Sequence, residues 1–89
     1  NQQNELGNYN IDIEGFAFSP SELTIKQGET VTWTNKDSVR HSIISDSGSE
    51  LSSSLFSTSE TYSHTFNTPG EFDYHCGAHP SMKAKIIVE

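Results

Sequence analysis

Apolar and polar residues alternate through most of this chain, with the two-residue period that is typical of half-buried β-strands. Between residues 30 and 35, Val31 and Trp33 fall on one face and three threonines fall on the other. Trp33 is therefore predicted to lie in the core. The same pattern predicts short strands over residues 9–13, 23–25, 30–35, 41–45, 61–66, 71–76 and 83–88.

Turn-forming residues separate these segments at short intervals. Ser, Pro and Gly mark turns at residues 19–21, 27–29 and 68–70, and the second of these is predicted to be a hairpin-type turn. Apolar stripes with the helical period of 3.6 residues are absent from the sequence. Seven or eight short strands with regular turns predict an all-β fold, an antiparallel sandwich or a barrel.

Residues 46–59 depart from the alternation. This segment is rich in serine, and its only large apolar residues are Leu51, Leu55 and Phe56. We expect it to form an excursion over the surface, with room for one helical turn.

The length and the charge of the chain limit the kinds of protein that it can be. Its 89 residues make one domain, and 12 acidic against 5 basic residues give a formal net charge of −7. This balance argues against binding of nucleic acid or of anionic membranes, and no stretch is apolar enough to span a bilayer. The polar residues 1–8 are interpreted as a linker remnant or a mature end, and residues 9–89 as the single domain.

The single cysteine, Cys76, excludes a disulfide within the chain. Domains of this size are often stabilised by disulfides or by a metal, so a metal is the remaining candidate. Alternation through residues 71–76 places Cys76 on the same face as Phe72 and Tyr74, which marks that face as the core side. His75 falls on the opposite face. A cysteine that points inward among aromatics is inert unless a bound cation stabilises its thiolate.

A set of possible metal ligands surrounds this cysteine in the sequence. His79 and Met82 follow Cys76 at intervals of three residues, and His41 lies 35 residues upstream. One thiolate, two imidazoles and one weak thioether suit a mononuclear copper site for electron transfer, whereas zinc prefers four comparable bonds. We therefore predict one copper ion per chain, cycling between Cu(I) and Cu(II). The other two histidines, His64 and His75, are predicted to be structural or surface residues.

The chain also resembles a known family, the cupredoxins of the plastocyanin and amicyanin type. The resemblance covers roughly residues 11–89 and is carried by residues 23–35, by Asp37, His41 and Phe66, and by residues 69–76 and 79–83. It implies a cupredoxin-like Greek-key β-sandwich of about eight strands with a type 1 copper centre. It further implies electron shuttling between larger redox proteins in an extracytoplasmic compartment.

The resemblance assigns roles to individual positions. His41, Cys76 and His79 correspond to the trigonal copper ligands, and Met82 to the axial ligand. Asn35 resembles an asparagine that ties the His41 loop to the cysteine sulfur. The exposed edge of His79 would be the electron port where redox partners dock, within an apolar rim drawn from Gly77, Ala78, Pro80, Leu51 or Leu55.

Four positions depart from the family pattern. Ser42 stands where asparagine is usual, at a position that the family uses for a cross-loop hydrogen bond. Arg40 replaces a proline and would bring a cation near the site. Ala84 replaces a glycine, and Ser81 replaces a bulkier apolar residue, which would leave the axial side more open.

These features leave several functions to weigh. The leading hypothesis is a monomeric, non-enzymatic one-electron carrier. The alternative is a copper protein with an open or weakly occupied axial position, which reacts with a small molecule such as nitric oxide. Copper delivery or storage is a third hypothesis, and a metal-free interaction module is a fourth.

Overall fold

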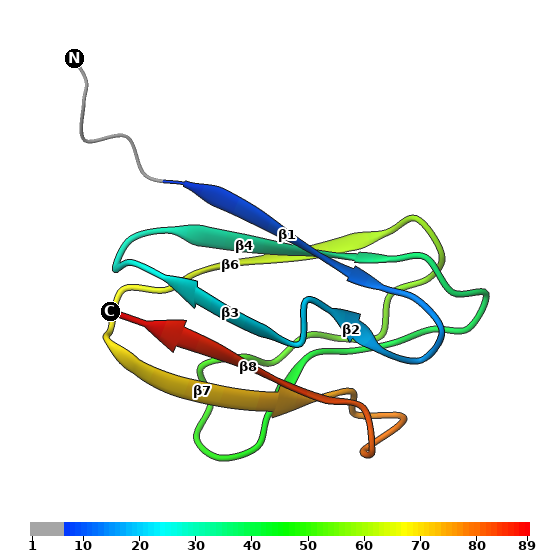
Figure 1. Cartoon of the computed structure of the whole chain (residues 1–89). Helices are drawn as coiled ribbons and strands as arrows, with labels where there is room; N and C mark the ends of the chain where they lie inside the picture. The colour runs from blue at the N-terminus through cyan, green and yellow to red at the C-terminus, as the bar shows by residue number, and fades with distance from the viewer. Residues whose placement is uncertain (1–6) are drawn as a thin grey trace.

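Eight β-strands make up the secondary structure of residues 7–89, the part of the chain that the computed structural model describes (Figure 1). They form two four-stranded sheets, which confirms the predicted all-β sandwich. Residues 1–6 of the predicted N-terminal segment lie outside the described residues. The strands are β1 (Asn8–Ile13), β2 (Phe18–Ser19), β3 (Glu22–Ile25), β4 (Thr30–Asn35), β5 (Ile44–Ser45), β6 (Thr61–Thr65), β7 (Gly70–His75) and β8 (Lys83–Val88).

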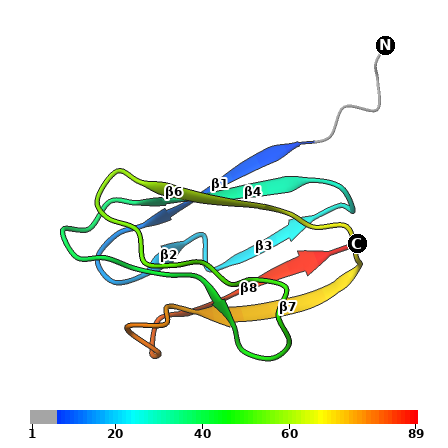
Figure 2. The same ribbon diagram turned by 180° about the vertical axis from the view of Figure 1, so that it is seen from behind.

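The order of the strands shows how the chain crosses between the layers (Figure 2). One sheet has the order β2-β1-β4-β6 and the other has the order β3-β8-β7-β5. The pairs β1–β4 and β3–β8 are parallel, so the sheets are mixed rather than purely antiparallel as predicted. The predicted hairpin at residues 27–29 is also wrong, because β3 and β4 belong to different sheets. The turn, with Gly28 at a φ of 89°, instead carries the chain from one layer to the other.

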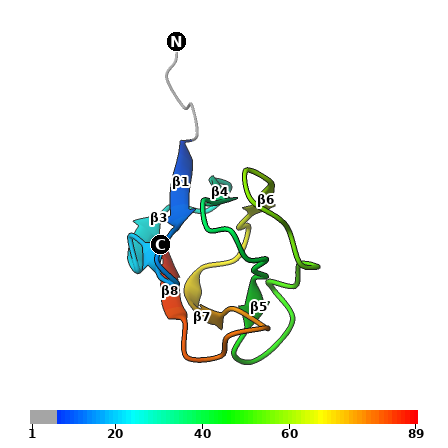
Figure 3. The same cartoon turned by 90° about the vertical axis from the view of Figure 1, so that its right-hand side faces the viewer.

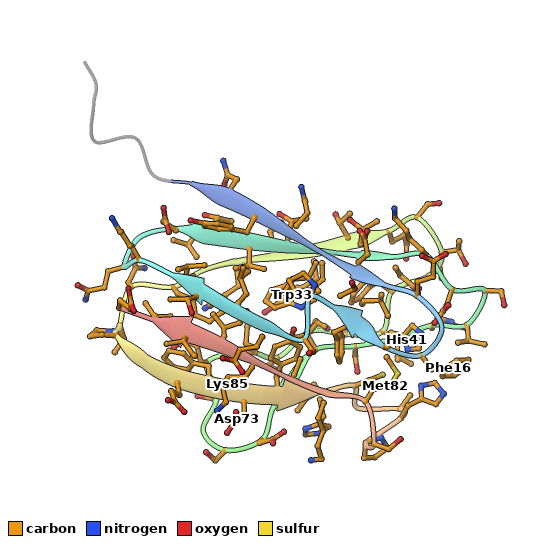
Figure 4. All side chains as sticks on the ribbon, viewed as in Figure 1. Phe16, Trp33, His41, Asp73, Met82 and Lys85 are labelled. Carbon is orange, nitrogen blue, oxygen red and sulfur yellow. The ribbon has the colours of Figure 1, made fainter. Side chains whose placement is uncertain are left out.

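The core between the two sheets is built on inward-facing side chains of β1, β4, β7 and β8. Trp33 (Figure 4) and Tyr74 are fully buried, and the Trp33 indole Nε1 donates a hydrogen bond of 3.1 Å to the Tyr74 hydroxyl. The buried indole N–H is thereby satisfied, and burial raises the pKa of the Tyr74 phenol. The predicted core position of Trp33 is confirmed.

The serine-rich segment before β6 contains no helical turn within the described residues, so that expectation is wrong. Leu51 and Phe56 are buried instead and anchor the segment to the core, while Leu55 is exposed. Isolated bridges pair His41 with Phe56 and Ile44 with Ser52. The predicted strand at residues 41–45 is therefore reduced to β5, because its first residues pair with this irregular segment instead of with β7.

One buried carboxylate fastens the start of β1 to the rest of the fold. Glu29 is only 7% exposed and accepts hydrogen bonds from the backbone N–H of Lys26 (2.8 Å), the backbone N–H of Gly7 (2.8 Å) and the Tyr9 hydroxyl (3.1 Å). These bonds, led by that from Lys26, hold the pKa of Glu29 below its usual value.

We expect this carboxylate to make stability depend on pH in the acidic range. Because the folded pKa of Glu29 is lowered, its contribution is present above about pH 4.3, the ordinary value of glutamate, and is lost as the pH falls through the folded pKa. Urea unfolding should therefore show Glu29→Gln to be destabilised at pH 7, with the gap to the unaltered protein closing towards pH 3. The control is Glu14→Gln at an exposed position. An equal gap at both pH values would contradict the prediction.

Candidate metal centre

The predicted ligands come from segments that leave both sheets at one end of the sandwich (Figure 1). His41 lies between β4 and β5, whereas Cys76 is the first residue after β7 and opens the loop that leads to β8. Figure 3 looks onto this end, where the loop after β7 and the segment that follows β4 face the viewer.

The structure brings three of the four predicted ligands to a common point. The Cys76 Sγ lies 3.5 Å from His41 Nδ1 and 3.6 Å from His79 Nδ1, and the three donor atoms all lie within 4.8 Å of one another. Metal bonds of about 2.0–2.3 Å at angles of 110–120° separate such donors by about 3.5–3.8 Å. The spacing therefore fits a single metal ion. Cys76 and His41 are fully buried, whereas His79 is partly exposed.

The loop that carries three of the ligand positions is closed by hydrogen bonds between those positions themselves. The N–H of Cys76 donates to the Met82 carbonyl (3.1 Å), that of His79 to the Cys76 carbonyl (3.1 Å), and that of Met82 to the His79 carbonyl (2.9 Å). Met82 is 5% exposed and lies at the same end of the fold as His41 (Figure 4). These backbone bonds thus hold the three residues in one closed loop.

The ring of His41 is held from its far side. Its Nε2 lies 2.9 Å from Asp37 Oδ2, so the ring donates its proton there and leaves Nδ1 free to bind a metal. Burial acts to raise the pKa of Asp37, but hydrogen bonds from the Phe16 amide, the His41 ring and the Gly15 amide outweigh it, and the pKa lies below its usual value. Asp37 therefore stays ionised and orients His41.

The cysteine sulfur is held by the segment that leads from His41 into β5. The Ser42 backbone N–H donates to Cys76 Sγ at 3.4 Å, and the Ser42 hydroxyl accepts a hydrogen bond of 3.0 Å from the Gly77 N–H. The serine thus supplies the cross-loop bond for which the family uses asparagine. A Cβ on Gly77 would lie 2.8 Å from the Ser42 Oγ and 3.1 Å from Ile44 Cγ1, so a larger residue at this position would displace the Ser42 hydroxyl.

Asn35 contributes to the site less directly than expected, because it bonds to residues around the His41 loop and not to the Cys76 sulfur. Its side-chain amide donates to the carbonyls of Val39 and Phe56, both at 2.9 Å, and its carbonyl oxygen accepts the Asp37 N–H at 2.8 Å. It therefore orders the turn before His41 and joins it to Phe56, whereas the sulfur receives its hydrogen bond from Ser42.

The two histidines predicted to be uninvolved lie in other pairings. His75 Nδ1 is 2.6 Å from Asp46 Oδ1, and His64 Nε2 is 2.6 Å from Glu50 Oε2. The alternation along β7 thus separated His75 from Cys76 correctly. Leu51 is 1% exposed and cannot form part of a surface rim, whereas Leu55 is 48% exposed.

Sequence reasoning missed Phe16, which lies beside both imidazoles; Figure 4 shows its side chain near His41. Its ring centroid is 5.0 Å from that of His79 and 5.5 Å from that of His41, with the ring planes nearly perpendicular in both pairs. The side chain is 50% exposed. Its position after Gly15, in a short apolar stretch, gives no sequence signal for a contact with residues 25 and 63 positions away.

Comparisons with known proteins agree with this geometry. The family model of copper binding proteins of the plastocyanin/azurin family matches residues 7–89. Amicyanin-alpha of Methylorubrum extorquens is 36% identical over 99% of this chain and 77% of its own length. Amicyanin of Paracoccus denitrificans is 35% identical over 89% of this chain, which spans 63% of that protein. Plastocyanin of Scenedesmus fuscus is 36% identical over 88% of this chain and 92% of its own length.

Solved structures give the same answer for the fold. A reduced Cu(I) form of an amicyanin variant superposes with a TM-score of 0.87 at 34% identity, over 93% of this chain and 83% of that one. The crystal structure of amicyanin from Paracoccus versutus gives 0.84 at 34% identity, over 90% and 79% of the two chains. The predicted resemblance is thereby confirmed, and the chain belongs to the copper-binding plastocyanin/azurin family of cupredoxins.

Proposed function

We propose that this chain is a one-electron carrier whose copper ion is held by His41, Cys76 and His79, with Met82 as the axial ligand. The family binds copper and its function is type 1 copper electron transfer, in agreement with the predicted cofactor and function. One observation supports these residues as the ligands: three donor atoms from two distant segments of the chain lie within 4.8 Å of one another. Copper, when bound, supplies a centre that gains and loses single electrons.

The protein's own contribution is to hold the donor atoms still. Asp37 fixes His41, Ser42 fixes the Cys76 sulfur, and the ring of backbone bonds fixes the loop of His79. Donors that are fixed before the metal arrives need little rearrangement when its charge changes, which favours fast electron transfer. Fixed donor atoms therefore favour a carrier over a delivery protein, because delivery requires ligands that release the metal readily.

The partners of a carrier are other redox proteins, and we place their docking surface around His79. Its imidazole is the partly exposed member of the set, whereas His41 and Cys76 are fully buried. The described residues contain no helix long and apolar enough to cross a membrane. We further propose an extracytoplasmic, monomeric carrier, in keeping with the chain's relation to amicyanins and plastocyanins.

The alternative of a copper ion that reacts with a small molecule is not favoured by the family. Met82, the proposed axial ligand, is also only 5% exposed, which argues against an open axial position although Ser81 is small. Azide added to the copper-loaded protein should leave its visible spectrum unchanged. A new absorption band on addition of azide would instead support an open axial position.

The carrier function is tested by loading the protein with copper and titrating it with an oxidant and a reductant. We expect one copper per chain, an intense thiolate-to-copper band in the visible, and one electron taken up per chain with loss of that band. Copper binding without a reversible one-electron couple would contradict the proposal.

The axial role of Met82 is tested by Met82→Leu, which keeps the apolar volume and removes the sulfur. We expect the visible band to persist and the reduction potential to rise by about 60 mV or more, a tenfold change in the equilibrium constant of a one-electron couple. The expected direction follows because loss of a sulfur donor disfavours Cu(II) more than Cu(I). An unchanged potential in cyclic voltammetry would show that Met82 only fills space.

A further inference from the structure

Phe16 combines two features that are unfavourable for a phenylalanine. Its backbone lies in the left-handed region, with a φ of 59°, where a bulky side chain is a genuine outlier. Its side chain is also half-exposed, so little burial compensates for the strain. Outliers of this kind persist where the surroundings hold them in place, and they gather at functional sites.

Phe16 lies in a two-residue turn between β1 and β2, which is closed by backbone hydrogen bonds between Glu14 and Ala17 (3.0 and 3.2 Å). The carboxylate that orients His41 holds this turn in place as well. Asp37 Oδ1 accepts the Gly15 N–H at 2.8 Å, and Asp37 Oδ2 accepts both the Phe16 N–H at 3.0 Å and the His41 Nε2–H at 2.9 Å. The loop at residues 15–16 and the His41 ring are therefore fixed by one side chain. Asp37 is in turn anchored through its own N–H by the buried Asn35.

The Phe16 ring extends this anchoring to the second imidazole. His41 has a hydrogen-bond partner on each ring nitrogen, whereas within residues 7–89 the His79 ring has one such partner, the Cys76 sulfur at 3.6 Å. Two aromatic rings pack against His79: the perpendicular Phe16 ring, 5.0 Å away between centroids, and the His41 ring, 5.2 Å away. Perpendicular aromatic pairs at this distance attract one another.

We propose that Asp37 and Phe16 form one positioning unit, in which Asp37 holds Phe16 and Phe16 holds the His79 imidazole in its metal-binding orientation. The inference rests on the proposed copper site, adds Phe16 to it as a positioning residue and gives Asp37 a second role. It explains why a strained, half-exposed phenylalanine stands at this loop. It also links the orientation of His79 to a carboxylate that does not touch it.

The test compares Phe16→Asn with Phe16→Tyr, since asparagine accepts the left-handed backbone but removes the ring, and tyrosine keeps the ring. In the metal-free protein, ¹⁵N relaxation of the His79 imidazole should show a fixed ring in the unaltered protein and in Phe16→Tyr, and a mobile ring in Phe16→Asn. In the copper-loaded protein, Phe16→Asn should lose copper to a chelator about tenfold faster. Leu55→Asn, at an equally exposed apolar position, is the control and should match the unaltered protein.

Asp37→Asn tests the link between the two residues. If Asp37 acts through Phe16, this variant should loosen the His79 ring as well as the His41 ring, and the double variant with Phe16→Asn should be no looser at His79 than either single variant. A fixed His79 ring in Phe16→Asn would overturn the inference. Absence of the visible band from the copper-loaded unaltered protein would instead overturn the copper site, and the relaxation measurements on the metal-free protein would still decide the role of Phe16.

Discussion

Replacing Cys76 with serine should abolish the visible absorption of the copper-loaded protein. The band that we expect comes from charge transfer between a thiolate sulfur and copper, and Cys76 is the only cysteine in the chain. A serine oxygen holds its electrons far more tightly than a thiolate does, so the corresponding transition moves out of the visible. The two side chains have nearly the same shape, and the buried position at the end of β7 should accept serine without unfolding.

The matched control for this experiment is His75→Gln, one residue away on the other face of β7. His75 is held by Asp46 at 2.6 Å, away from the convergent donors, so its loss should leave the band unchanged. Circular dichroism of both variants shows whether the sandwich is intact. A visible band that survives in Cys76→Ser would mean that copper binds elsewhere, and the proposed site would have to be abandoned.

The parts of the site that could be predicted from the sequence are those set by local period and spacing. The two-residue period along β7 placed Cys76 with Tyr74 on the inner face and His75 outside, because side chains of a strand alternate whatever the strand pairs with. The three-residue spacing of Cys76, His79 and Met82 likewise grouped three candidate ligands in one short segment. Local pattern therefore indicated three of the four proposed ligands, whereas His41, 35 residues upstream, lies beyond its reach.

Pairings between distant segments could not be predicted in this way. The turn at residues 27–29 has the chemistry of a hairpin, but whether the next strand returns to the same sheet depends on burial of the whole core. Phe16 was missed for a similar reason, because its contact with His79 requires the loop after β1 to meet the loop after β7. Ser42 is a third example. Its backbone N–H bonds to the Cys76 sulfur and its hydroxyl bonds to the Gly77 N–H, so it takes over the cross-loop role of asparagine because Gly77 lies close to it.

Copper binding should raise the melting temperature of the protein by a large amount. The folded chain holds three donor atoms within 4.8 Å of one another, whereas the unfolded chain separates His41 from Cys76 by 35 residues and cannot offer the same site. A ligand that binds only the folded state at about a thousandfold excess over its dissociation constant stabilises it by about 4 kcal/mol. For a domain of this size we expect a rise of about 15–30 °C by calorimetry, since each kcal/mol is worth about 4–8 °C.

Melting curves of Cys76→Ser with and without copper show whether the stabilisation comes from the proposed site. Without its thiolate the variant should gain little from copper, while its metal-free melting temperature should lie near that of the unaltered metal-free protein, since the cavity is filled by a side chain of similar size. If copper raised both proteins equally, the stabilisation would come from binding at surface histidines such as His64 or His75. Equal melting temperatures of the unaltered protein with and without copper would contradict a site assembled by the fold. Asp37, Ser42 and the closed loop already hold the donor atoms in place, so little ordering is needed on binding and little of the binding energy is lost to it.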